Sequence, residues 1–454
     1  MSMLSVLIPI ALLFVIILCK KIPKIGGNIH AALVISGLAA LLLGGVYNPI
    51  TWLVSWVDGV DRIAWVMMLS IFGTIYAETQ ISMGTMDTVL TLSRATFGKS
   101  PKGLLVAIMI SLALAGSLLG DAIAVSTVVG VLIVKPLYDM GLKPEEISAT
   151  VVMGALLGSV CPPISGAIFQ ACGLVGASTD EASMYAYVTV GLAIAFSCVY
   201  ASFAFVKIKS LPPELIPEKK AGQIFREGWI TLLPMGVLIL IVILRSGPWA
   251  IDIIADLYAP FINLIADIPI VQGFTNIILL AVFSVTVLSF LSAKVRKRGV
   301  VDIVKTGIHN VLPCTGVQLA AGFMLGAFYA SGVIETIEQF AMTLNIHVLK
   351  LGGAAAMALV GMLTGSQTTA QSAIFTFLGP ALISSGLDPA KVASAGAQIA
   401  TAGQAMPPAD LCTFVVAGLV GGILGVKVDS VKSMIRSFPG FFVLFLGGIA
   451  LLYI

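Results

Sequence analysis

Long apolar runs, separated by short polar or charged interruptions, dominate the chain. Nine of these runs approach the roughly 20 residues that an α-helix needs to cross a bilayer. The pattern therefore predicts an all-α, polytopic membrane protein. The expected spans cover residues 2–19, 28–46, 62–77, 103–119, 184–206, 230–244, 277–293, 311–333 and 437–454.

Three stretches between the spans are more polar. Residues 207–227 combine prolines with mixed charge, which predicts a linker between two halves of the chain. Residues 85–97 and 300–310 mix apolar and charged positions in the manner of amphipathic helices. We expect both segments to lie along the membrane surface as arms that brace the bundle.

Two regions, 116–178 and 365–422, interrupt their apolar runs with glycine, proline and hydroxyl residues, and they match each other without a gap. With an offset of 245 residues, Gly365 falls on Gly120 and the pair Pro407-Pro408 falls on Pro162-Pro163. A shared richness in glycine is the alternative explanation, but it does not place the prolines in register. The match indicates two inverted repeats.

Each repeat has the order of a re-entrant hairpin followed by a broken helix. The proline pairs must interrupt their helices, because proline lacks a backbone donor and clashes with the preceding turn. Irregular backbone is tolerated in a bilayer only where it is buried in protein or lines a cavity. We therefore expect the four breaks to converge on one site near the membrane midplane.

Polar side chains at the breaks supply the candidate ligands. Carbonyls at half-helix C-termini bind cations, and N-terminal amides hold carboxylates. Oxygen-rich clusters suit a hard cation such as Na⁺, although the hydroxyls could instead bond the carbonyls of their own helices. The candidate Na⁺ ligands are Ser117, Gly120, Asp121, Gly365, Ser366, Thr368, Thr369 and Gln404. The candidate substrate-binding residues are Ser126, Thr127, Cys161, Pro162, Pro163, Ser165, Gln371, Ser372, Pro407, Pro408 and Asp410.

Asp121 and Asp410 are the carboxylates inside the repeats' breaks. An intramembrane carboxylate is costly and usually functional, so either could bind a cation or carry a proton. The alternative is that one of them lies at the membrane edge and is merely solvated. Glu78 stands near a helix end and is interpreted as interfacial.

Composition agrees with the membrane assignment: 58% of the 454 residues are hydrophobic, 10% are charged and the net charge is +3. These values and the absence of a basic face give no support to nucleic-acid binding. The six cysteines lack metal-ligand spacing and are expected to be small buried hydrophobes. No nucleophile–base pair, phosphate loop or haem motif is recognisable, so the chain is not expected to be an enzyme.

Basic clusters predict the orientation. Lys20, Lys21 and Lys24 directly follow the first run, which has no cleavage site and reads as a retained helix. The positive-inside rule places that end in the cytoplasm. A bacterial or archaeal cytoplasmic membrane, with its lipid as surroundings, is the expected location.

The runs A-G-S-L-L-G-D-A, G-L-K-P-E-E and G-A-L-L-G-S-V-C-P-P-I-S, with G-L-D-P and A-G-Q-A-M-P-P-A-D in the second repeat, resemble a known family. It is the large, DctM-like membrane subunit of tripartite ATP-independent periplasmic (TRAP) transporters, within the wider ion-transporter superfamily. The sequence departs from the family pattern at Cys161, Met406 and Asp410. These departures concern the substrate more than the architecture.

The resemblance implies Na⁺-coupled uptake of a small organic anion, such as a C4-dicarboxylate or sialic acid, by an elevator mechanism. It implies two partners, a small four-helix membrane subunit and a soluble substrate-binding protein. It also implies a division into scaffold (1–102, with the first arm, and 181–350, with linker and second arm), transport repeats (103–180 and 351–426) and a C-terminal helix (427–454).

Three other hypotheses remain open at this stage. A gluconate- or citrate-type permease would need no partners. A Na⁺/H⁺ antiporter of the same superfamily would use Asp121 as its proton carrier. A membrane scaffold or receptor that transports nothing gives no reason for four polar helix breaks in register.

Overall fold

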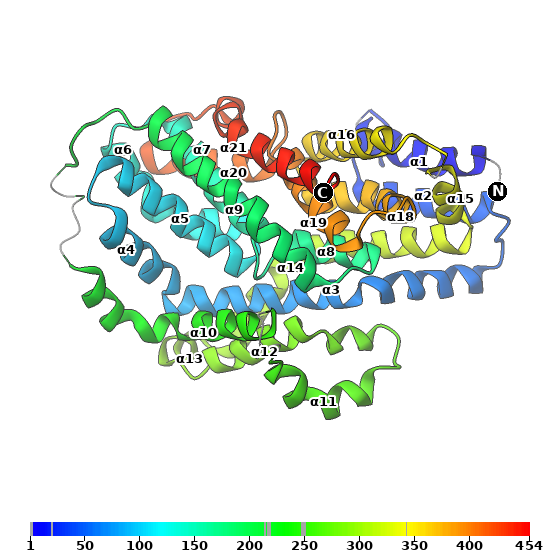
Figure 1. Cartoon of the computed structure of the whole chain (residues 1–454), viewed down its shortest axis with the longest axis horizontal. Helices are drawn as coiled ribbons and strands as arrows, with labels where there is room; N and C mark the ends of the chain where they lie inside the picture. The colour runs from blue at the N-terminus through cyan, green and yellow to red at the C-terminus, as the bar shows by residue number, and fades with distance from the viewer. Residues whose placement is uncertain (1–2, 20, 213–214, 216–218, 247–250, 342) are drawn as a thin grey trace.

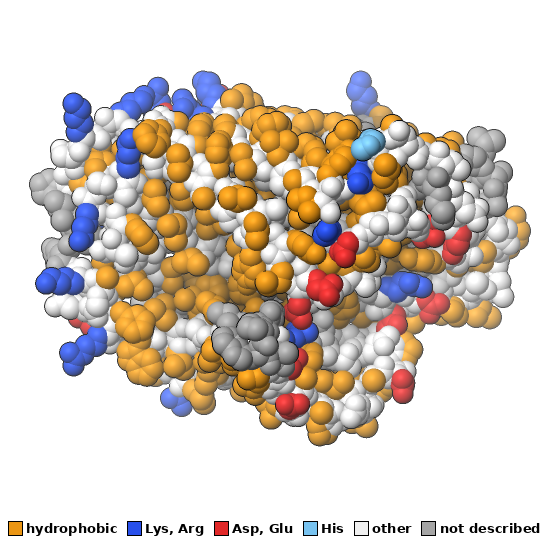
Figure 2. Space-filling model, in the orientation of Figure 1, with side chains coloured by type: hydrophobic (Ala, Val, Ile, Leu, Met, Phe, Trp, Pro, Cys, Tyr) orange, Lys and Arg blue, Asp and Glu red, His pale blue; other side chains and the backbone are white. Residues whose placement is uncertain are grey.

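The computed structural model describes residues 3–19, 21–212, 215, 219–246, 251–341 and 343–454. Within these residues the chain is helical throughout, without a β-strand, which confirms the expected fold class. Eight of the described helices are long and apolar enough to cross a membrane. Apolar side chains cover much of the visible face, and lysines and arginines gather toward one end (Figure 2). The chain is a multi-pass membrane protein.

The described helices of the first half include four that are long and apolar enough to span a membrane, and they contain one complete repeat (Figure 1). Each helix of this repeat begins at a proline or a capped residue, as helix starts in general do. They are α1 (Met3–Leu18), α2 (Ile29–Leu43), α3 (Pro49–Met83), α4 (Thr85–Phe97), α5 (Pro101–Leu119), α6 (Ala122–Asp139), α7 (Pro144–Val160), α8 (Gly166–Val175) and α9 (Thr179–Ala204).

The second half follows the same plan with one added irregularity, a π-helical turn called η3. Its elements are α10 (Ala221–Ser246), α11 (Ile253–Ile265), the 3₁₀ turn η2 (Val271–Thr275), α12 (Ile277–Ser289), α13 (Ala293–Arg298), α14 (Val300–Ala330), α15 (Val333–Ala341), α16 (Ile346–Thr364), α17 (Gln367–Ala370), η3 (Gln371–Phe375), α18 (Thr376–Ser384), α19 (Pro389–Gln404), α20 (Leu411–Leu424) and α21 (Ser430–Leu451).

The element bounds confirm the repeat. Helix α5 and helix α16 begin and end at the same offset of 245 residues, and α6 corresponds in the same way to the continuous segment α17–η3–α18. Helix α7 corresponds to α19 and α8 to α20. Each repeat is therefore a hairpin followed by a broken helix.

The two repeats enter the molecule from opposite ends. In Figure 1 the first hairpin, α5–α6, lies toward one end of the long axis, whereas the second hairpin, with α16 and α18, lies toward the other. Both hairpin tips point inward. This inverted arrangement brings all four interrupted helices to the middle of the molecule.

Two long helices, α3 and α14, cross in close contact and form the centre of the remaining bundle. A Cβ atom on Gly59 would lie 1.9 Å from the Gly322 carbonyl oxygen, and one on Gly326 would lie 1.7 Å from the Ser55 carbonyl oxygen. Glycine at these positions lets the backbones touch, as in other membrane helix pairs. Helix α3 has 35 residues, and at about 1.5 Å per residue it exceeds the roughly 30 Å hydrocarbon thickness.

The prediction of a separate surface arm at residues 300–310 is wrong. These residues are the first third of α14, which continues without interruption to Ala330. Ile303 and Gly307 pack against α3, with Gly307 directly on Ile75, so this face is buried in protein. The amphipathic pattern reflected a helix–helix contact instead of a membrane surface.

Residues 85–97 form a helix of their own, α4, which turns away from α3 at Gly84 in the left-handed conformation (φ 78°). Its place along the membrane surface stays a prediction. Its counterpart in the second half is α15, which leaves α14 at Gly332 (φ 77°). Helix α4 packs on the first hairpin through α5, and α15 packs on the second through α18.

Other sequence predictions meet the structure less cleanly. The linker expected at 207–227 ends earlier, because α10 begins at Ala221. Helix α11 was not expected. Some predicted positions lie outside the described residues: residue 2, where the first span was expected to begin, Lys20 of the first basic cluster, and residues 213–214 and 216–218 of the linker.

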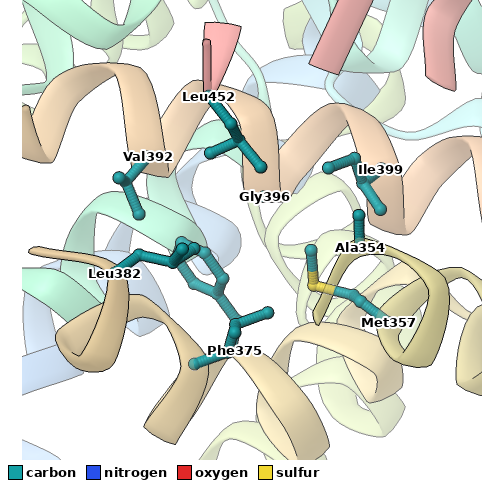
Figure 3. Close-up of a pocket in the computed structure, with 9 residues that line it drawn as sticks. Ala354, Met357, Phe375, Leu382, Val392, Gly396, Ile399 and Leu452 are labelled. Atoms are coloured by element: carbon teal, nitrogen blue, oxygen red, sulfur yellow. The ribbon is translucent and has the colours of Figure 1, made fainter. Parts of the chain in front are cut away.

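The interior of the second repeat is densely packed. Phe375 sits between α16, α18 and α19, and a Cβ on Gly396 would lie 2.4 Å from its ring (Figure 3). The void beside it has a volume of about 10 Å³ and is lined almost entirely by apolar side chains. Such a space holds at most about one water molecule.

The glycine contact between α3 and α14 yields a prediction. Gly59→Ala should lower the melting temperature of the purified protein, because overpacking of this kind costs about 1–3 kcal/mol or more. Gly73→Ala in the same helix is the matched control, since no atom lies within 4 Å of its added Cβ. Equal melting temperatures for the two variants would contradict the close crossing.

Candidate functional site

Four half-helices begin at the centre of the molecule, and each is capped by the side chain that precedes it. Asp121 caps α6, Ser165 caps α8, Ser366 caps α17 and Asp410 caps α20. Such caps satisfy the amides that a helix start leaves without partners. The four breaks are therefore polar because their exposed helix ends must be satisfied inside a membrane protein.

The repeats differ in which break carries the carboxylate. At the hairpin tips Asp121 corresponds to Ser366, and at the proline breaks Ser165 corresponds to Asp410. The aspartate therefore stands at the tip in one repeat and at the proline break in the other.

The capped helices pair across the two repeats. Helix α6 packs on α20, where Ser126 Oγ lies 3.5 Å from Cys412 Sγ. Helix α8 packs on the second hairpin, where Gln170 Nε2 donates to the Thr368 carbonyl oxygen (3.1 Å) and to Ser372 Oγ (3.0 Å). The two aspartate-capped helices are thus neighbours, and so are the two serine-capped segments.

Each hairpin tip also contacts the proline break of its own repeat. Ile164 N donates to the Ser117 carbonyl oxygen (3.0 Å), and Gln367 N donates to Gln404 Oε1 (2.8 Å). Gly120 and Gly365 occupy the tips with φ of 65° and 66°. A Cβ on Gly365 would lie 2.0 Å from the Ala409 carbonyl oxygen, so only glycine fits this approach.

A cavity of about 780 Å³ lies where the tips meet α3 and α14. Part of the predicted site lines it directly: Gly120, Asp121, Thr127, Gly365, Ser366, Thr368, Thr369 and Gln404. The other predicted residues are not among those that line it, and most are buried, although Pro408 is exposed: Ser117, Ser126, Cys161, Pro162, Pro163, Ser165, Gln371, Ser372, Pro407, Pro408 and Asp410. Among the residues that line the cavity there is no lysine, arginine or histidine.

Asp121 and Asp410 occupy different environments. Asp121 lines the cavity and uses one oxygen, Oδ1, to accept from Ile123 N (2.8 Å) and Ala124 N (3.3 Å), while Oδ2 has no partner among the described residues. Asp410 is fully buried, and both its oxygens accept hydrogen bonds: Oδ1 from Gln404 Nε2 and Cys412 N, Oδ2 from the amide and hydroxyl of Thr413. Of these two aspartates, Asp121 is therefore the one that presents an oxygen without a described partner to the cavity.

The hydroxyls divide between the two interpretations that the sequence left open. Thr127 Oγ1 donates to carbonyls of its own helix, at Ile123 and Ala124. Ser126 and Ser372 instead join different repeats. Gln371 is fully buried in η3, and its amide nitrogen and oxygen have no hydrogen-bond partner among the described residues. A π-helical turn of this kind is frequent at functional sites.

Several residues that line the cavity were missed from the sequence. Gln170 lies one turn into α8, and the opposite wall carries polar residues of α3 and α14, including Glu78, Asn310 and Gln318. Glu78 is not simply interfacial: it is 8% exposed, lines the cavity and pairs with Arg298 (2.9 Å). Polar residues spaced four apart in an apolar helix were the available signal.

Among the described residues no group of three or more His, Cys, Asp or Glu side chains could hold a metal ion. A cation in this cavity would be held by carbonyls, hydroxyls and single carboxylates. This donor set suits Na⁺ and does not suit a transition metal.

A family model described as the DctM component of the tripartite ATP-independent periplasmic transporter matches residues 10–347, well over half of the chain. The chain belongs to this family. As a TRAP permease it is a secondary transporter subunit, and nothing points to catalysis. The matched region contains the first repeat, whereas the second repeat lies almost wholly beyond it.

The fold is similar to that of two solved membrane transporters. The YdaH transporter of Alcanivorax borkumensis is 15% identical over 93% of this chain and 97% of its own, with a TM-score of 0.60. MtrF of Neisseria gonorrhoeae, described with a class of antimetabolite efflux pumps, is 13% identical over 98% and 94%, with a TM-score of 0.61. No curated protein sequence matches the chain. At these identities the likeness shows the fold alone.

The saturated hydrogen bonding of Asp410 predicts a structural role. Asp410→Ala should destabilise the TRAP permease more than Asp121→Ala does. Both lose a cap, worth about 0.5–2 kcal/mol, but Asp410→Ala also leaves buried donors without partners, which costs about 1–3 kcal/mol more. Melting temperatures of the purified variants without Na⁺ or substrate check this order, and the reverse order would contradict it.

Proposed function

We propose that this TRAP permease takes up a small organic anion together with Na⁺, by moving its two repeats as a unit against the remaining helices. The single observation that carries the proposal is the cavity of about 780 Å³ at the junction of both hairpin tips with α3 and α14. Secondary transporters with inverted repeats bind their substrates at such junctions of discontinuous helices.

The cation belongs beside Asp121. Its Oδ2 has no partner among the described residues and it lines the cavity. Asp410, on the neighbouring helix α20, uses both its oxygens to accept hydrogen bonds from Gln404, Cys412 and Thr413. The tip backbone around Gly120 offers carbonyl oxygens to complete an oxygen shell. Na⁺ prefers ligands of this hard, oxygen-only type.

The anion belongs beside the serine-capped helices. The segment that begins at Gln367 and the helix α8 present their N-termini near each other, joined by Gln170. Amides at helix N-termini favour negative charge, and a serine cap adds none of its own. Because no lysine or arginine lines the cavity, the bound cation and these amides must neutralise a carboxylate between them.

The moving unit includes more of the chain than the sequence suggested. Helices α9 and α21 pack on the broken helices α7 and α19, and Arg436 pairs with Glu146 (2.9 Å) across α21 and α7. Tyr200 on α9 donates to the Arg436 carbonyl oxygen (3.0 Å). We therefore assign residues 101–204 and 346–451 to the transport domain, and α1–α4 with α10–α15 to the scaffold.

The family works with a small DctQ subunit and a periplasmic binding protein. We propose the same partners for this chain: the binding protein delivers the anion, and the small membrane subunit packs on the scaffold. The cytoplasmic membrane of a bacterium or archaeon is the compartment in which such an assembly works.

A Na⁺/H⁺ antiporter is the second candidate, and the free oxygen of Asp121 is the observation that favours it. A carboxylate with one uncommitted oxygen on a cavity can carry a proton as well as bind a cation. In that case no organic anion would add to the effect of Na⁺.

The proposal predicts stepwise stabilisation by Na⁺ and then by substrate. Na⁺, with choline holding the ionic strength, should raise the melting temperature of the purified permease, because a ligand that binds only the folded state stabilises it. One member of a carboxylate panel should raise it further in saturating Na⁺. No response to Na⁺ would exclude Na⁺ coupling, and a Na⁺ response with no carboxylate response would favour the antiporter.

The Na⁺ response should depend on Asp121 and not on Asp410. Asn caps helices as well as Asp does, so Asp121→Asn keeps the cap and removes the charge. We expect this variant to weaken the apparent Na⁺ affinity at least tenfold. Asp410→Asn is the matched control, expected to lower the starting melting temperature while leaving the Na⁺ midpoint within about twofold. Equal Na⁺ midpoints in both variants would place the cation elsewhere.

A further inference from the structure

The scaffold wall of the cavity carries two polar stripes that face each other. Both follow the i, i+4, i+8 spacing that puts residues on one face of a helix. Helix α3 contributes Ser70, Thr74 and Glu78, and the antiparallel helix α14 contributes Asn310, Cys314 and Gln318. Polar residues inside a membrane are costly, so two aligned stripes need a reason beyond solubility.

The stripes are joined at both ends. Asn310 Nδ2 donates to Glu78 Oε1 (3.1 Å) at one end, and Gln318 Nε2 donates to Ser70 Oγ (3.3 Å) at the other. We call this set of six residues the scaffold stripe. It spans roughly 12 Å along the helices at about 1.5 Å per residue.

The amide of Asn310 has a fixed orientation. Arg298 pairs with Glu78 Oε2 (2.9 Å), which holds the carboxylate in place, and a carboxylate accepts only from the NH₂ side of an amide. Asn310 is exposed and lines the cavity, and its Oδ1 has no partner among the described residues. The stripe therefore presents a fixed hydrogen-bond acceptor to the cavity.

The two hydroxyl groups of the stripe donate their hydrogens to backbone carbonyls of their own helix. Ser70 donates to the Val66 carbonyl oxygen (2.9 Å), and Thr74 donates to carbonyls of Ser70 and Ile71. Gln318 Oε1 is a further acceptor without a partner, buried at the far end of the stripe. What the stripe leaves for a ligand is the two amide oxygens, Asn310 Oδ1 and Gln318 Oε1, and the second N–H of each amide.

The oriented acceptor Asn310 Oδ1 shares the cavity with the proposed anion-binding helix ends, which points to a substrate that carries hydrogen-bond donors as well as a carboxylate. We propose that the scaffold stripe, through Asn310 Oδ1, selects organic anions that carry hydroxyl or ammonium donors beyond their carboxylate. The inference rests on the proposed function, since it names the substrate class of the same cavity. A site built to bond a donor rejects the analogue without it, because its own polar group is then left unpaired.

The test compares carboxylates that differ only in their hydroxyl groups. Binding to the purified full-length permease is measured in saturating Na⁺ with propionate and lactate, succinate and malate, and hexanoate and gluconate. We expect the hydroxylated member of the binding pair to bind at least tenfold more tightly. Asn310→Leu, which has nearly the same shape, should bring the two affinities within about twofold while the affinity for the unsubstituted acid stays unchanged.

Two further variants keep the test decisive. Asn310→Ala replaces the leucine variant if that one does not fold. Gln398→Met is the control outside the cavity: like Asn310, Gln398 donates through its amide nitrogen (to Ser394 Oγ, 3.1 Å) and keeps an amide oxygen without a partner among the described residues, but it does not line the cavity. It should leave the preference intact.

The outcomes separate this inference from the proposed function. Equal affinity of the wild type for both members of a pair, or a preference that survives both Asn310 variants, overturns the inference alone. A loss of both affinities in the Asn310 variants shows a structural residue and also overturns it. If no carboxylate of any pair binds in Na⁺, the proposed function falls as well.

Discussion

The constraint on which this structure depends is that lipid offers no hydrogen-bond partner to a broken helix. Each interruption in the two repeats leaves backbone amides without partners at a helix start, and the side chain directly before the helix accepts hydrogen bonds from them. The first role of these side chains is therefore to cap a helix, whether or not they also bind a ligand; they are Asp121, Ser165, Ser366 and Asp410. The polarity of the centre follows from backbone satisfaction, and binding chemistry is built on what these caps leave free.

The caps also explain why the repeats interlock. A hairpin tip is held by the proline break of its own repeat, as Gln404 holds the amide of Gln367, and by a half-helix of the other repeat, as Gln170 holds the Thr368 carbonyl. Neither repeat has a complete site without the other. A displacement of one half-helix would therefore move donors on both sides of the cavity.

Much of this could be predicted from the sequence, because glycine and proline constrain the backbone wherever they occur. The register of 245 residues, the hairpins, the broken helices and the placement of Asp121 and Ser366 at the tips all follow from such residues. The arm assigned to residues 300–310 failed for a physical reason. An amphipathic period records that one face is buried, and it does not say whether lipid headgroups or α3 cover that face.

The parts of the site contributed by long-range packing were out of reach. Glu78 and Asn310 are 232 positions apart and become partners only once α3 and α14 cross. The different states of Asp121 and Asp410 could not be read from their spacing either, because both follow the same rule for a helix start. The difference is that Gln404 and Thr413 donate hydrogen bonds to the carboxylate of Asp410, whereas no such donors reach Oδ2 of Asp121 among the described residues.

The exchange of aspartate and serine between the repeats has a consequence for how such a protein can diverge. In a perfectly duplicated chain the two halves would place identical groups around the centre, and the charge of the caps would be distributed symmetrically about it. Here one acidic and one hydroxyl cap in each half, at opposite breaks, put both acids on one flank and both hydroxyls on the other. All four residues are good caps, so substitutions among them leave the backbone path intact. Two such replacements after duplication are enough to give a symmetric fold a polar axis.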